Sequence, residues 1–216
     1  MKAIHKVVGT AVPLNRTDID TDIIIPQKWL ITTERNGLGV GLFSNWRYRI
    51  GTLDPDPKFV MNESRFVKAK IIVAGANYGC GSSREHAVWA HLDYGIEAII
   101  APSFGPIFYD NALKNGLLAI ILDEQIVESL MAQLIVMKTN QMSVDVKCCE
   151  VSGPDGSPYT FSIDSQRQAA LLSGQDDIAE IFFEKEAILD FQRDDRLRHP
   201  WAWAFPDKVE SIYGLP

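Results

Sequence analysis

The residues best suited to chemistry in this sequence stand in one short run, GANYGCGSSREHA, from Gly75 to Ala87. Its glycines, at positions 75, 79 and 81, permit tight turns and a close approach of the backbone to a ligand. A strand is expected before the run and a helix after it, and the free amides of a helix start attract negative charge. The run therefore predicts an anion-binding loop whose polar side chains face the anion: Ser82, Ser83 and Arg84.

Arg84 is the expected carboxylate ligand, because a guanidinium group offers two parallel hydrogen bonds that fix orientation as well as charge. Ser82 would take a proton from carbon if the surrounding amides and the arginine stabilised its oxyanion. Glu85 and His86 would support these groups. The structural alternative is a capping box between Ser82 and Glu85, a surface ion pair at Arg84 and a core or helix-face position for His86. For Glu85 and His86 this alternative is the preferred interpretation.

Cys80 suggests a second chemistry, a thiolate nucleophile with His86 as its base. This hypothesis ranks below the serine hypothesis for two reasons. The six-residue separation of Cys80 and His86 across a helix start does not ensure that they are in contact, and a cysteine at such a position is more often a small buried residue. The other cysteines are the adjacent Cys148 and Cys149, interpreted as small residues in a strand. None of the three has the C-x-x-C spacing of zinc or iron–sulfur sites, so no metal site is expected in this chain.

Three carboxylates alternate along the segment from Asp18 through Asp20 to Asp22. Such spacing is compatible with a calcium or magnesium site, but the glycine and glutamate positions of a calcium loop do not follow. The preferred interpretation is that these carboxylates orient or balance a cationic group across a cleft. The alternative is ordinary charge on an exposed loop.

Around these residues the hydrophobic pattern predicts strands that alternate with helices. Strands are expected at Lys6–Leu14, Lys70–Ala74, Ala98–Ala101 and Leu117–Leu122, and helices at Gln27–Asn36, Arg84–Asp93 and Ile107–Asn115. Later, a hairpin is expected from Ser143–Val151 and Tyr159–Ile163, followed by helices at Ser165–Leu172 and Asp177–Gln192. The glycine-rich stretch Leu38–Phe43 has the composition of a mobile loop. The alternation predicts an α/β fold with a partly parallel sheet.

Composition narrows the classes of partner and compartment. The 216 residues carry a formal net charge of −7 with a pI near 5.1, which argues against nucleic acid as a partner. No run reaches membrane-spanning length and no leader segment is evident at Met1–Leu14, so no membrane partner is expected. The odd number of cysteines indicates a reducing compartment, and we expect a cytoplasmic protein.

Three segments together resemble the swivelling domain of the aconitase superfamily: Asp20–Pro26, Asn77–Ala87 and Pro102–Phe108. As a free-standing chain of this size, the sequence is most similar to the small-subunit family of the bacterial isopropylmalate isomerases. The resemblance covers residues 1–201 and implies a single aconitase-like swivelling domain there, with three β/β/α layers around a mixed, partly parallel sheet. Residues 202–216 would be a C-terminal extension, whose role the sequence does not indicate.

The resemblance also implies an activity and a partner. The family isomerises 2-isopropylmalate to 3-isopropylmalate through 2-isopropylmaleate in leucine biosynthesis, and its large subunit carries a 4Fe-4S cluster as the Lewis acid. By motif position, Ser82 would be the catalytic base, and Ser83 and Arg84 would bind carboxylate. The segment Asp20, Thr21 and Asp22 would lie near the cleft, and Leu38, Leu42 and Phe43 would recognise the isopropyl group. The chain would act only in a heterodimer or heterotetramer with the large subunit.

Alternatives remain open at the level of substrate and class. A related hydratase would act on citramalate, dimethylmalate or homoaconitate, although the apolar side chains between Leu38 and Phe43 favour an apolar substituent. The chain could instead be a noncatalytic module that binds small carboxylates. A cysteine-dependent enzyme is the third possibility, and it depends on Cys80.

Overall fold

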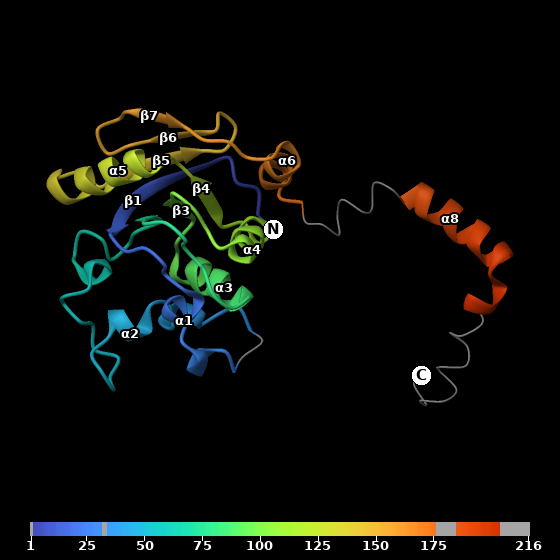
Figure 1. The fold of residues 1–216 in the computed structure, drawn as a ribbon, viewed down its shortest axis with the longest axis horizontal. Helices are drawn as coiled ribbons and strands as arrows, with labels where there is room; N and C mark the ends of the chain where they lie inside the picture. The colour runs from blue at the N-terminus through green and yellow to red at the C-terminus, as the bar shows by residue number, and fades with distance from the viewer. Residues whose placement is uncertain (1, 32–33, 176–184, 204–216) are drawn as a thin grey trace. The chain divides into compact units, whose positions relative to one another are not determined.

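The computed structural model describes residues 2–31, 34–175 and 185–203, and Figure 1 shows the fold. The chain forms two compact units, residues 1–174 and residues 175–216. The expected single domain that ends at residue 201, with an extension over 202–216, stays a prediction. No helix within the described residues is both long enough and apolar enough to cross a membrane.

One seven-stranded mixed sheet organises the first unit, in the order β4-β3-β2-β1-β5-β6-β7. The strands are β1 (Lys6–Leu14), β2 (Ile71–Ala74), β3 (Ala98–Ala101), β4 (Leu118–Ile121), β5 (Gln141–Asp145), β6 (Glu150–Ser152) and β7 (Pro158–Thr160). Strands β1 to β4 are parallel, whereas β5, β6 and β7 continue the sheet in antiparallel pairs. This confirms the expected α/β class with a mixed, partly parallel sheet.

Helices follow the parallel strands as crossover connections. They are α3 (Glu85–Tyr94) between β2 and β3, and α4 (Pro106–Asn115) between β3 and β4. Helix α5 (Glu124–Val136) packs on β1, β2 and β3, and Figure 1 shows it across the sheet from α3. Strands β2 and β3 are buried at every position, so both faces of these two parallel strands are covered.

The segment between β1 and β2 contains short helical turns instead of long elements. They are α1 (Thr21–Ile24), η1 (Gln27–Trp29), η2 (Leu38–Val40), α2 (Ser44–Arg47) and η3 (Val60–Asn62). The expected helix over Gln27–Asn36 was therefore wrong in extent: a single 3₁₀ turn forms, and residues 32 and 33 lie outside the described chain. After the sheet come α6 (Ser165–Ser173) and, in the second unit, α8 (Lys185–Arg198) and η5 (Pro200–Ala202).

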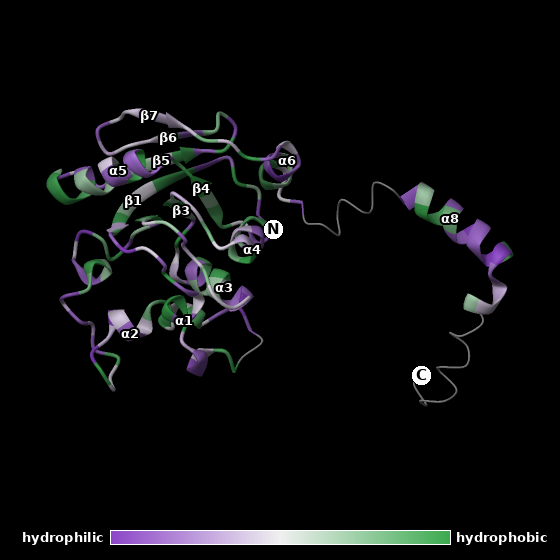
Figure 2. Ribbon diagram, in the orientation of Figure 1, coloured by the Kyte–Doolittle hydropathy of each residue, from purple (hydrophilic) through white to green (hydrophobic). Residues whose placement is uncertain are grey.

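Hydropathy follows this arrangement. In Figure 2 the strands at the centre of the sheet and the turn α1 are hydrophobic, while much of α8 is hydrophilic. Helix α8 has no buried residue, in contrast with α3, where Ala87, Val88 and Ala90 are fully buried. The core of the first unit therefore lies between the sheet and the helices that cover its faces.

Candidate active site

Two loops meet at the carboxyl ends of β1 and β2, where adjacent parallel strands commonly form a ligand crevice. The glycine loop, residues 75–83, lies beside residues 16–21. Four backbone hydrogen bonds join them: Gly75 N to Arg16 O (3.0 Å), Asp18 N to Ala76 O (2.9 Å), Gly79 N to Ile19 O (2.8 Å) and Thr21 N to Cys80 O (2.9 Å). The parallel register of the strands thus brings together two segments about sixty residues apart in sequence.

Glycine is required in this loop for conformation and for space. Gly79 and Gly81 have φ angles of +72° and +90°, in the left-handed region that disfavours side chains. A Cβ on Gly79 would lie 2.2 Å from the Phe108 ring, and one on Gly75 would lie 2.5 Å from the carbonyl oxygen of Arg16. The loop can therefore turn and remain closely packed only with these glycines.

Arg84 occupies the N-cap position of α3 with an extended backbone conformation. Its guanidinium forms a two-pronged ion pair with Asp22: Nη1 donates to Oδ1, and Nη2 donates to Oδ2 at 3.0 Å. The Arg84 side chain is 19% exposed and that of Asp22 is 57% exposed. Because Arg84 is the cap, the alternative capping box between Ser82 and Glu85 does not form.

Thr21 and Asp20 fix the other side of the loop. The Thr21 hydroxyl donates to the carbonyl of Ser82 at 2.9 Å. The Asp20 carboxylate caps α1 by accepting from the amide of Ile23 at 2.7 Å. Ser82 and Ser83 are both exposed, so their hydroxyls can reach a ligand.

A hollow of about 170 Å³ opens at this point between two walls of different chemistry. Ser82, Arg84, Thr21 and the glycine loop form the polar wall, and Pro106, Ile107 and Phe108 at the start of α4 form the other. Of the expected site residues, Thr21, Ser82 and Arg84 line this hollow. The residues from α4 were absent from the expected site, although the segment Pro102–Phe108 belongs to the resembling motifs.

Glu85 and His86 take part in contacts within the helical layer. The Glu85 carboxylate accepts from the Asn115 amide at 2.8 Å, which joins the start of α3 to the end of α4. The His86 ring lies 4.9 Å from the Trp89 ring on the same helix. The helix-face contact of His86 fits the structural alternative, whereas Glu85 bonds to Asn115 and not within a capping box.

The stretch Leu38–Phe43 differs from the mobile loop expected from its glycines. Leu38, Leu42 and Phe43 are buried in the core, with at most 1% of each residue exposed. The Gly39 amide donates to the Asp93 carboxylate at 2.7 Å, and its carbonyl accepts from Arg47 at 2.9 Å. The expectation of a mobile loop was wrong, because these partners hold the segment against the end of α3.

The acidic residues and Cys80 have separate roles. Asp18 accepts a hydrogen bond from the Asn77 side chain at 2.7 Å, which is the main reason that its pKa is lowered. Burial, followed by the nearby carboxylates of Asp20 and Asp18, raises the pKa of the Cys80 thiol, which disfavours a thiolate at neutral pH. Among residues 2–31, 34–175 and 185–203, no three histidine, cysteine or acidic side chains converge as metal ligands.

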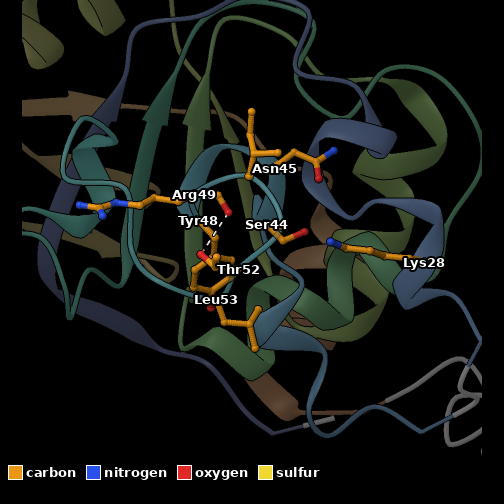
Figure 3. A pocket seen from close by; sticks show the side chains of 9 residues that line it. Lys28, Ser44, Asn45, Tyr48, Arg49, Thr52 and Leu53 are labelled. Carbon is orange, nitrogen blue, oxygen red and sulfur yellow. Dashed lines mark hydrogen bonds between the residues drawn. The ribbon is translucent and has the colours of Figure 1, made fainter.

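A larger hollow, of about 490 Å³, lies elsewhere, between Lys28, Ser44 and the turn over residues 49–53. Figure 3 shows the Lys28 side chain extending toward Ser44, whereas Arg49 points away from the other labelled side chains. None of the site residues expected from the sequence lines it. We therefore place the candidate active site at the smaller hollow beside Ser82 and Arg84.

The mixed sheet, with its glycine loop and arginine at the ends of parallel strands, defines a domain of the aconitase type. In agreement, the family described as the aconitase C-terminal domain matches residues 1–125. The 3-isopropylmalate dehydratase small subunit 2 of Bordetella parapertussis is 47% identical over 201 residues, which are 93% of this chain and 99% of the relative. The corresponding small subunit of Cupriavidus necator is 46% identical, over 89% of this chain and 94% of the relative.

A solved structure supports the same assignment. The 3-isopropylmalate dehydratase of Methanocaldococcus jannaschii superposes with a TM-score of 0.60 at 27% identity, covering 87% of this chain and 99% of that one. The expected aconitase-like swivelling fold is thus confirmed. The chain belongs to the family of 3-isopropylmalate dehydratase small subunits.

Proposed function

We propose that this chain is the small subunit of a heteromeric hydro-lyase that converts 2-isopropylmalate to 3-isopropylmalate through 2-isopropylmaleate in leucine biosynthesis. The names of its relatives support this reaction. The observation that carries the proposal is the hollow that places Ser82 and Arg84 together at the strand ends. The cytoplasm remains the expected compartment.

Arg84 is the proposed carboxylate ligand. A guanidinium group has five N–H donors, and Asp22 accepts two hydrogen bonds from that of Arg84. The remaining donors are sufficient for a substrate carboxylate, while Asp22 keeps the guanidinium plane fixed. Ser83, exposed beside Arg84, would add a hydroxyl donor to a carboxylate.

Ser82 is the proposed base, which takes the proton from the carbon beside a carboxylate and returns it in the second half-reaction. A serine alkoxide needs strong stabilisation, and backbone amides of the glycine loop with the Arg84 charge are suited to provide it. The cysteines of this chain, one in the glycine loop and two between β5 and β6, are unsuited to hold a cluster together. We therefore assign the 4Fe-4S cluster, which supplies Lewis acidity, to the large subunit.

Replacing Ser82 in the assembled enzyme tests this assignment. We expect Ser82→Ala to lower kcat for 2-isopropylmalate by about 100-fold or more, the range for loss of a general base, with little change in substrate affinity. Ser64→Ala, which changes another exposed loop serine, should leave turnover unchanged. Normal turnover in Ser82→Ala would refute the role of Ser82. Citramalate, dimethylmalate and homoaconitate, assayed in parallel, distinguish the alternative substrates.

A further inference from the structure

The hollow beside Ser82 has an apolar wall that the reaction chemistry does not explain. Proton transfer and carboxylate binding need only its polar side, with Ser82, Arg84 and Thr21. The same hollow is also lined by Pro106, Ile107 and Phe108. A ligand that fills this hollow would therefore meet both polar and hydrocarbon surface.

The start of α4 is fixed directly against the glycine loop. The Gly105 amide donates to the Tyr78 carbonyl at 2.8 Å, and Tyr78 pairs with Phe104 as an isolated parallel bridge. A Cβ on Gly105 would lie 2.5 Å from the Gly79 carbonyl oxygen, which shows how closely the two backbones approach. A substrate held by Arg84 thus meets a wall at a defined position.

Pro106 and Ile107 are the exposed residues of this wall, and Ile107 carries the larger side chain. Phe108 is 4% exposed and belongs to the core, where its ring contacts Tyr78 and His91. Ile107 is 51% exposed, because successive helical residues are about 100° apart and Phe108 takes the inward direction. An apolar substituent that covered Ile107 would remove hydrocarbon surface of both partners from water.

We propose that Ile107 is a specificity-determining residue that contacts the branched alkyl substituent of the malate substrate. The inference rests on the proposed function and extends it, because it locates side-chain recognition at the start of α4. The buried state of Leu38, Leu42 and Phe43 leaves the exposed surface of Ile107 as the better placed apolar contact beside Arg84. Malates with an isopropyl substituent would then be preferred over those with a methyl substituent, because a methyl group is too short to contact Ile107.

The test compares two malates on the assembled enzyme. The selectivity is the ratio of kcat/KM for 2-isopropylmalate to that for citramalate, which carries methyl in place of isopropyl. Loss of one methylene contact changes such a ratio by about 10-fold or more, so Ile107→Ala should lower the selectivity at least about 10-fold, and Ile107→Val less. Ile135→Ala is the matched control, because Ile135 on α5 is 54% exposed but does not line the hollow.

An unchanged selectivity in Ile107→Ala would overturn the inference. So would an equal loss of kcat/KM for both malates, or a defect confined to subunit assembly, which gel filtration measures. Calorimetric binding of both malates to each variant gives a second readout that does not need turnover. If binding is selective and depends on Ile107 but no isomerisation occurs, the proposed function is refuted and the role of Ile107 is supported. Isomerisation with a selectivity that does not depend on Ile107 would support the proposed function and refute the role of Ile107.

Discussion

Tyr78 of the glycine loop and His91 of α3 form a hydrogen-bonded pair, and both side chains are fully buried. His91 Nδ1 lies 2.6 Å from the Ala87 carbonyl, which can only accept, so Nδ1 carries the proton. Nε2 therefore accepts from the Tyr78 hydroxyl at 2.6 Å. Burial lowers the pKa of His91 to about 4 and raises that of Tyr78, so the pair is neutral at physiological pH.

This pairing predicts strong coupling between the two positions. Tyr78→Phe should lower the free energy of unfolding by about 1–3 kcal/mol, because it leaves His91 Nε2 buried without a donor. The double variant Tyr78→Phe/His91→Leu should recover most of that loss, since it removes both polar groups. Urea unfolding of the free chain measures both values. Additive losses in the double variant would contradict the proposed coupling.

The pair should also make stability depend on pH. His91 has a lowered pKa when folded and an ordinary value near 6.5 when unfolded, so between these values the unfolded chain binds the extra proton. Stability should therefore fall as the pH drops from 6.5 toward 4, by about 3 kcal/mol in total at roughly 1.4 kcal/mol per pKa unit. Carboxylates such as Asp18, with lowered pKa values, lose their contribution at still lower pH. The double variant, which lacks His91, should not show the loss between pH 6.5 and 4.

At the scale of elements, the local sequence predicted the strands and helices that have a clear period. β1 and β3 have the expected bounds, and α3 and α4 begin within one residue of them. Helix α5 was missed, although Ile126, Val127, Leu130, Met131 and Leu134 follow a helical period. The expected strand Ser143–Val151 is two strands, because the Asp145 carboxylate accepts from the amides of Lys147 and Cys148 and turns the chain. The paired cysteines thus lie in a turn, not in a strand.

The parts of the candidate site that lie close together in sequence were predictable. The glycine loop and Arg84 followed from composition and from the strand before it, and the resemblance placed Asp22 near the same cleft. The ion pair of Arg84 with Asp22 spans 62 positions and depends on the register of β1 with β2, which no local pattern specifies. Ile107 was not predicted for the same reason. An exposed apolar residue on a helix becomes a candidate ligand contact only when the tertiary structure shows which groups line the same hollow.

Gly39 shows how one residue joins η2 to α3. A Cβ there would lie 2.7 Å from the backbone nitrogen of Tyr94, and backbone cannot move aside as a flexible side chain can. Gly39→Ala should therefore lower the free energy of unfolding by about 1–3 kcal/mol through overpacking. The neighbouring Val40→Ala, at a residue that is 40% exposed, should change it by less than about 0.5 kcal/mol. Equal urea unfolding midpoints for the two variants would contradict this prediction, because they would show that the segment accommodates the added methyl group without loss of stability.

At the scale of the whole molecule, the cysteines are distributed in a way that favours a divided enzyme. Cys80 lies in the glycine loop after β2, whereas Cys148 and Cys149 lie between β5 and β6, beyond β1 in the sheet order. The acidic chain, with a formal charge of −7, has its candidate substrate groups around Arg84, at the carboxyl ends of β1 and β2. A cluster held by a second subunit would complete the site from outside this chain.

The proposed assignment of the cluster to a large subunit predicts where iron and activity should be found. Purified alone under anaerobic conditions, this chain should contain no stoichiometric iron or acid-labile sulfide and should not turn over 2-isopropylmalate. Co-expression with a cluster-bearing large subunit should yield a complex with both, and Cys80→Ala, Cys148→Ala and Cys149→Ala should leave its iron content unchanged. Stoichiometric iron on the isolated chain, or iron lost from the complex on replacing these cysteines, would place the cluster here and contradict the division.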